Sequence, residues 1–151
     1  MSFYNDLERG KIGEQLVYNA LTAKKHNITD LRNDIEARFN DIDFALEKNG
    51  LKTTLEIKTD HRSEDTGNFF IEYQNRNNKK HNYKGWYRYC KAEFICFVQE
   101  TARKAYIVSL DELKETLKKG KFRTASGVDA CGFLLPFSIL QQFESLFCLE
   151  L

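Results

Sequence analysis

Residues 42–58, IDFALEKNGLKTTLEIK, decide the fold, because they have the pattern of an antiparallel β-hairpin. The pair Asn49-Gly50 is the strongest short hairpin signal in a sequence, since both residues accept the positive φ of a type I′ turn. A two-residue turn there sets the register, so that Phe44 faces Leu55. Five apolar residues then share one face, which we expect to be buried in the core: Ile42, Phe44, Leu46, Leu55 and Ile57.

The other face of this hairpin places Asp43 directly opposite Glu56. Directly opposed residues have Cβ atoms roughly 4.5–5.5 Å apart, and like charges there are destabilising unless a proton or a cation relieves them. Two converging carboxylates favour Mg²⁺ or Mn²⁺, and the backbone carbonyl of Ile57 is a candidate third ligand. Lys58 projects on the same face, where its ammonium group can hold a nucleophilic water or stabilise charge on a phosphate.

The same pattern has a second interpretation, in which the polar face of the hairpin is solvated. Asp41 then pairs with Lys58, and Glu47 pairs with Lys52, as weak cross-strand ion pairs. Helical segments come before and after the hairpin in the sequence. They favour a covered polar face instead, because helices can then pack on both faces of the sheet. We therefore expect the opposed carboxylates to have a function.

The chain of 151 residues has the length of one domain, and we treat residues 1–151 as a single unit. Apolar residues at helical spacing predict a helix over 3–26, and Asp111 and Gly120 mark the start and the end of another. Strands are expected at 69–74, 93–99 and 104–109, followed after a loop by a C-terminal helix that starts near Pro136. This order predicts an α/β fold with a mixed sheet of about five strands flanked by helices.

Asp43, a turn and then Glu56-Ile57-Lys58 resemble the active-site signature of the PD-(D/E)XK nuclease superfamily. The resemblance covers most of the chain and implies the restriction-endonuclease-like fold, with Asp43 and Glu56 holding Mg²⁺. Where members of that family often have a proline before the aspartate, this chain has Ile42.

Two further positions follow from this resemblance. The helix that contains Gly13-Glu14 is similar to the family's first helix, whose glutamate often joins the metal site, and this implies a role for Glu14. The family's third strand often carries a polar residue near the metal. Glu72 and Gln74 both fit that place in this sequence, and Glu72 is slightly favoured.

A basic segment with interleaved aromatic residues follows the strand at 69–74. Six Lys and Arg residues occur there without an acid, although the whole chain has a net charge of only +1. Basic side chains neutralise phosphates, and rings such as Trp86 stack on unpaired bases or serve the core. We therefore expect DNA to be bound by Trp86 together with Arg76, Lys79, Lys80, Lys84, Arg88 and Lys91.

The remaining signals concern the setting and the assembly of the chain. The four cysteines lack metal-type spacing and stand among apolar residues, which predicts buried free thiols and a reduced, cytoplasmic setting without a membrane span. The C-terminal segment has more large apolar residues than one small sheet needs, which predicts a homodimer face. Those residues are Phe133, Leu134, Leu135, Phe137, Ile139, Leu140, Phe143, Leu146 and Phe147.

The sequence thus predicts a small Mg²⁺-dependent deoxyribonuclease of the kind frequent in phages and mobile elements. Asp43 and Glu56 would bind the metal, Lys58 would serve the attacking water or the transition state, and Glu14 with Glu72 or Gln74 would assist. Endonuclease and exonuclease activity both remain open, as do duplex, single-stranded, branched and RNA substrates. The alternative is a non-catalytic nucleic-acid-binding or protein-binding domain on a nuclease-like fold, such as a subunit or inhibitor of a DNA-processing complex.

Overall fold

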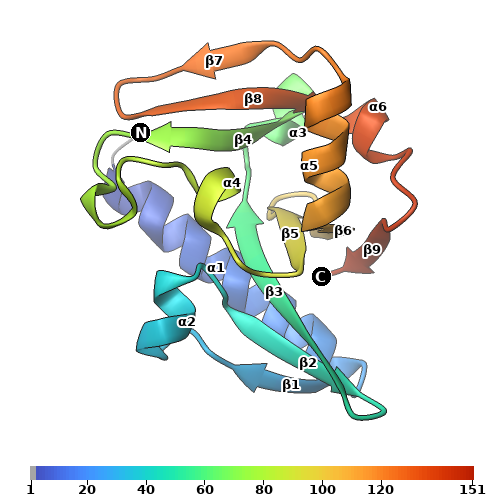
Figure 1. The fold of residues 1–151 in the computed structure, drawn as a ribbon. Coiled ribbons are helices and arrows are strands. Elements are labelled where there is room, and N and C mark those ends of the chain that lie inside the picture. Colours follow the sequence, from blue (N-terminus) through green and yellow to red (C-terminus); the bar gives the residue numbers. More distant parts are fainter. Residues whose placement is uncertain (1–2) are drawn as a thin grey trace.

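The computed structural model describes residues 3–151, which form an α/β fold with two β-sheets and flanking helices (Figure 1). Within these residues the larger sheet has six strands, one more than expected, in the order β1 (Asn27–Asp30), β2 (Phe44–Lys48), β3 (Leu51–Thr59), β5 (Phe94–Gln99), β6 (Lys104–Ser109) and β9 (Phe147–Glu150). The smaller sheet has three strands, in the order β4 (Asn68–Asn75), β8 (Ala130–Pro136) and β7 (Thr124–Ser126).

The hairpin of β2 and β3 has the predicted turn and register. Asn49 and Gly50 have φ values of 53° and 78°, and Phe44 pairs with Leu55. β3 lies between β2 and β5 but pairs with each over only part of its length. It pairs antiparallel with β2 from Leu51 to Leu55, and on its other edge it pairs parallel with β5 from Leu55 to Thr59. The sheet is therefore mixed, and the edge of β3 that faced β2 is left open beyond Leu55.

Helix α1 (Phe3–Ala23) covers one face of the larger sheet. Val17 and Leu21 on this helix are buried against the apolar side of the hairpin, including Phe44 and Leu55. The chain leaves the helix at Ala23, before the expected end at residue 26.

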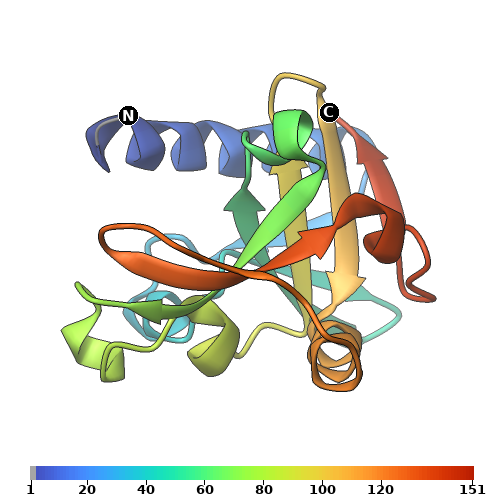
Figure 2. The ribbon, with the colours of Figure 1, turned by 90° about the horizontal axis from the view of Figure 1, so that it is seen from above.

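The second sheet covers the opposite face of the larger one. Figure 2 shows β4 and β8 running across β5 and β6, with α1 in blue and α5 in orange at opposite sides of the view. Phe69 of β4, Phe97 of β5 and Leu135 of β8 are fully buried in this second part of the core. The helices besides α1 are α2 (Ile35–Phe39), α3 (Ser63–Thr66), the 3-10 turn η1 (Lys79–His81), α4 (Trp86–Tyr89), α5 (Leu110–Lys119) and α6 (Phe137–Leu140).

The C-terminal third differs most from the sequence prediction. The expected loop before Pro136 contains β7 and β8, and the expected C-terminal helix is the single turn α6, followed by β9. The apolar residues of this segment have a use within the chain, because Leu135, Leu140 and Phe143 are buried in the core. Phe147 is exposed, at 49%. A homodimer stays a prediction.

Two general expectations can be compared with the structure. Cys90 and Cys96 are buried free thiols, but Cys131 is half-buried and Cys148 is exposed, so the prediction of four buried cysteines was wrong for these two. No helix in the described part of the chain is long and apolar enough to cross a membrane.

Candidate active site

The candidate site lies where β3 parts from β2. Asp43 immediately precedes β2, and its backbone amide donates a hydrogen bond to the carbonyl of Leu55 (3.0 Å). Its carboxylate oxygen Oδ2 accepts a hydrogen bond from the backbone amide of Ile57 (2.9 Å). Asp43 thus binds the open edge of β3 next to Glu56, which is 5% exposed.

Lys58 is held between two carboxylates. Its Nζ lies 2.8 Å from Oδ2 of Asp41 and 3.0 Å from Oε1 of Glu56. The ammonium group also lies 5.4 Å from the centre of the Trp86 ring, in a cation–π contact. These three contacts fix the end of the lysine beside the carboxylates.

Asp41 is anchored in an unusual backbone conformation. Its φ of 58° lies in the left-handed region, which Asp tolerates better than most residues. Its amide donates to the carbonyl of Arg38 at the end of α2 (3.2 Å), and its carbonyl accepts a hydrogen bond from Sγ of Cys90 just after α4 (3.3 Å). Asp41 and Lys58 form the ion pair that the second interpretation expected, but the strand pairing ends at Phe44 and Leu55 and the pair is partly buried instead of solvated.

Glu14 reaches the same place from α1. It lines a cavity of about 780 Å³ together with Asp43 and Glu56. Burial, together with the charge of Asp43, raises the pKa of Glu14 from 4.5 to about 7, although Arg32 and Lys58 oppose this rise. The structure therefore brings together three of the carboxylates that the sequence proposed.

The electrostatics of the site favour the uptake of positive charge. Burial raises the pKa of Asp43 and of Glu56, in spite of the positive charge of Lys58 nearby. Burial by itself would lower the pKa of Lys58, but Asp41 and Glu56 outweigh it and hold that pKa well above its ordinary value. Lys58 is thus charged, and the carboxylates around it still exceed it in number.

The donor set suits a hard divalent cation, because it consists of carboxylate and carbonyl oxygens. Among the described residues, no three His, Cys, Asp or Glu side chains are already arranged to hold a metal ion. Both central carboxylates already have partners, since Glu56 is paired with Lys58 and Asp43 with the amide of Ile57. The residues fit Mg²⁺ or Mn²⁺ by chemistry, once Glu56 releases the lysine.

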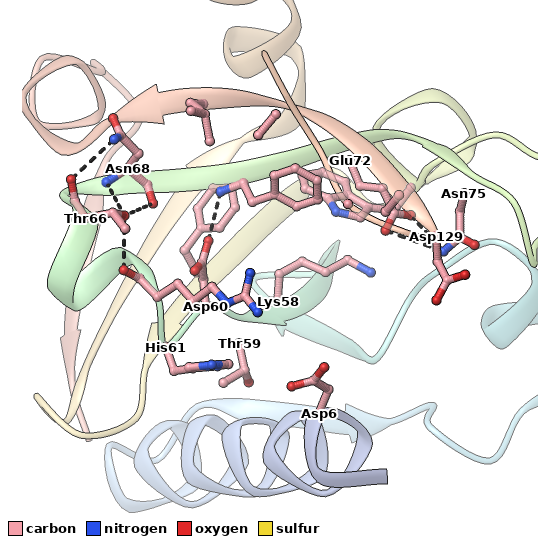
Figure 3. A pocket seen from close by; sticks show the side chains of 18 of the residues that line it. Asp6, Lys58, Thr59, Asp60, His61, Thr66, Asn68, Glu72, Asn75 and Asp129 are labelled. Atoms are coloured by element: carbon pink, nitrogen blue, oxygen red, sulfur yellow. Dashed lines mark hydrogen bonds between the residues drawn. The ribbon is translucent and has the colours of Figure 1, made fainter. Parts of the chain in front are cut away.

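A larger cavity of about 1150 Å³ lies on the other side of Lys58. Figure 3 shows Lys58 reaching into it between Asp6 on α1 and Glu72 on β4, with Thr59 and His61 along the helix side. Asp6 lines both cavities, so the two are adjacent.

The structure separates the two candidates on β4. Glu72 is half-buried and lines the larger cavity, where its carboxylate accepts long hydrogen bonds from Nδ2 of Asn75 (3.4 and 3.5 Å). Burial raises its pKa, which the charge of Lys58 opposes. Gln74 follows an irregularity in the strand pairing, is exposed and lines neither cavity.

The basic segment borders the larger cavity through Trp86 and Tyr89, but its basic side chains do not line either cavity. None of Arg76, Lys79, Lys80, Lys84, Arg88 and Lys91 lines either of them. Trp86 is 6% exposed and packs in the core under Lys58, so it has little ring surface left for stacking on a base. Trp86 contacts the lysine, and its role in DNA binding stays a prediction.

Sequence reasoning missed Arg32, which also faces the carboxylates. It lies between β1 and α2 and lines the smaller cavity. Its guanidinium group contacts Asp30 and Gln15, and it stacks over the rings of Tyr18 and Phe44. No local pattern marks this residue, because only the packing of α1 against β1 and β2 brings it to the site.

No protein-family model and no curated protein matches the chain. Among solved structures, a bacterial homing endonuclease matches with a TM-score of 0.50 and 15% sequence identity, over 84% of this chain and 72% of that one. A nuclease from a fusselovirus matches with a TM-score of 0.44 and 13% identity, over 91% of this chain and 86% of that one. The chain shares the fold of the homing endonuclease. At this identity the likeness concerns the fold alone, and membership of the PD-(D/E)XK superfamily stays a prediction.

Proposed function

We propose that this protein is a metal-dependent DNA nuclease of the PD-(D/E)XK type. The observation that carries the proposal is the position of Lys58, whose ammonium group lies 3.0 Å from the buried carboxylate of Glu56. Asp43 and Glu14 line the same cavity as Glu56. Carboxylates that hold a cation, next to a fixed ammonium group, can promote phosphodiester hydrolysis by stabilising the charge that develops on the phosphate.

Each residue has a role in this proposal. Asp43, Glu56 and the carbonyl of Ile57 would hold Mg²⁺ or Mn²⁺, with Glu14 as an additional acidic group. The bound ion would polarise the phosphoryl group and lower the pKa of a water. Lys58 orients that water or stabilises charge on the phosphate, while Glu72 assists from the larger cavity, which Lys58 also lines.

The experiment is a cleavage assay on plasmid, single-stranded and branched DNA, with Mg²⁺, with Mn²⁺ and with a chelator. Asp43→Asn and Glu56→Gln are expected to abolish cleavage, because each removes a charged ligand while it preserves the shape of the side chain. Glu47→Gln is the matched control, since Glu47 stands exposed on the same hairpin. If both site variants cut DNA like the parent, the reaction takes place elsewhere.

One observation favours a second candidate, a non-catalytic nucleic-acid-binding or protein-binding domain. Among the described residues no three acidic, thiol or imidazole groups are arranged to hold a metal, and Lys58 already neutralises Glu56. Calorimetry with Mn²⁺ separates the two candidates. Heat of binding that disappears in Asp43→Asn supports the nuclease, whereas DNA binding without metal uptake or cutting supports the second candidate.

A homodimer is part of the proposal, since one chain of this size offers a small footprint on DNA. The C-terminal segment supplies the expected contact, and Phe147 on the edge strand β9 is its exposed member. Sedimentation at high micromolar concentration tests this, and a monomer there rules the dimer out.

A further inference from the structure

Three basic residues share the smaller cavity with the carboxylates. They come from three different parts of the chain, and they are Lys11 on α1, Arg32 after β1 and Arg38 on α2. The six basic residues of segment 76–91 line neither cavity. The basic residues that line the smaller cavity are therefore different from those of the segment that the sequence assigned to DNA binding.

Arg32 is held in place before any ligand arrives. Its Nε and Nη2 donate to the two carboxylate oxygens of Asp30 (2.9 and 2.7 Å), and Nη1 and Nη2 donate to Oε1 of Gln15 (3.3 Å each). An arginine has five N–H donors, so these contacts leave one N–H of Nη1 free. Its guanidinium carbon lies 5.1 Å from the centre of the Phe44 ring, which limits its motion further.

Lys11 and Arg38 are exposed and only weakly engaged. Lys11 contacts Glu8 on its own helix at 3.6 Å, and such exposed pairs contribute little. Arg38 makes no ion pair with any side chain that the structure describes. Both can turn toward an anion without breaking a strong contact.

The arrangement separates two tasks within one cavity. The carboxylates attract a cation and repel phosphate, so a nucleic-acid strand needs positive charge beside them to approach the site at all. The basic segment 76–91 does not supply that charge within the cavity, whereas Lys11 and Arg38 do; Arg32, whose charge Asp30 balances, adds a fixed N–H donor.

We propose that Lys11, Arg32 and Arg38 bind the backbone phosphates that flank the scissile phosphate, so that the cut strand enters across α1 and α2. This inference rests on the proposed nuclease function. It moves the main DNA contact from the basic side chains of segment 76–91 to the lining of the smaller cavity, and it assigns Arg32 the fixed contact and the two exposed residues the adaptable ones.

The test measures how DNA binding depends on salt, with the Glu56→Gln protein in Mg²⁺ as the background for all further variants. Binding is measured by fluorescence anisotropy with labelled duplex and single-stranded oligonucleotides. Each lost phosphate contact reduces the slope of log K against log salt by about 0.9 for duplex and about 0.7 for single strands. Lys11→Gln and Arg38→Gln are each expected to show this reduction, with about eightfold weaker duplex binding at 0.1 M salt. Arg32→Gln should do the same.

Lys79→Gln and Lys80→Gln are the matched controls, because both residues are exposed and lie outside the cavities. Unchanged slopes in these controls, with reduced slopes at Lys11 and Arg38, support the inference. The reverse pattern overturns it, as do unchanged slopes in all variants. If the parent protein cleaves DNA while the Lys11 and Arg38 variants bind DNA as tightly as the Glu56→Gln protein, this inference is wrong and the proposed nuclease function is supported. A parent that neither binds nor cuts removes both.

Discussion

Replacing Glu14 by Gln is expected to stabilise the metal-free protein at high pH. Burial and the charge of Asp43 raise the pKa of Glu14 from 4.5 to about 7. The folded protein therefore favours the protonated side chain, which Gln resembles in shape and in charge. At pH 8 the parent must keep a carboxylate in this half-buried place, and the variant does not.

The size of the effect follows from the two pKa values. At 1.36 kcal/mol per pKa unit, a rise from 4.5 to about 7 corresponds to about 3.4 kcal/mol. Glu14 is only partly buried, so solvent screening reduces this to roughly 1–2 kcal/mol. A carboxyl group with a raised folded pKa costs nothing below its unfolded pKa of about 4.5 and its full amount above about 7. The gain from Gln should thus grow between pH 4.5 and 7.

Urea unfolding of parent and variant at pH 4, 6 and 8, without divalent metal, measures this gain. Glu8→Gln on the same helix is the control, and as a surface change it should stay within about 0.5 kcal/mol of the parent. Added Mn²⁺ should stabilise the parent more than Glu14→Gln, because a ligand of the folded state adds stability according to its affinity. A gain that is equal at all three pH values, or absent at pH 8, would refute the electrostatic reasoning.

Lys58→Met should lower the free energy of unfolding at pH 8 by about 3–5 kcal/mol, because Asp41 and Glu56 lose their buried counter-charge. The loss of unfolding free energy, measured in urea, should be smaller at pH 5, because the raised pKa of Glu56 favours protonation of its carboxylate. A loss that is the same at both pH values contradicts this. Asp41→Asn should keep the left-handed backbone conformation at this position, because Asn also tolerates it, but it removes the ion pair with Lys58. The kcat for DNA cleavage should therefore fall, while the dissociation constant for Mn²⁺ stays unchanged. A weaker affinity for Mn²⁺ would instead indicate that Asp41 is a metal ligand. Gly13→Ala should cost about 1–3 kcal/mol in thermal unfolding, because its Cβ collides with Oγ1 of Thr59. Gly10 has open space around it, so Gly10→Ala should instead raise the free energy of unfolding by about 0.5–1 kcal/mol. Equal effects of the two substitutions would show that the contact with Thr59 is not the cause.

The hairpin could be predicted in detail because its information is local. Asn49-Gly50 fixes the turn, and the turn fixes which residues face each other, so the pairing of Phe44 with Leu55 followed from sequence. The strands β7 and β8 were missed because their pairing with each other and with β4 is set by residues distant in the chain. A segment such as residues 124–126, Thr-Ala-Ser, has no pattern of its own that distinguishes a strand from a loop.

The candidate site shows the same division. Its central residues were predictable, because they stand on one hairpin whose register the turn determines. The contribution of Arg32, the burial of Trp86 and the absence of the six basic side chains of segment 76–91 from both cavity linings were not, because they depend on how separate elements pack.

By itself, the sequence determined a two-stranded bend with Asp43, Glu56 and Lys58 on one side, since backbone geometry at a tight turn leaves few alternatives. The tertiary structure alone decided the charge environment of those residues. Burial and the packing of α1 and α4 around β3 determine which carboxylates retain protons, where the lysine is held, and which basic residues surround the cavity.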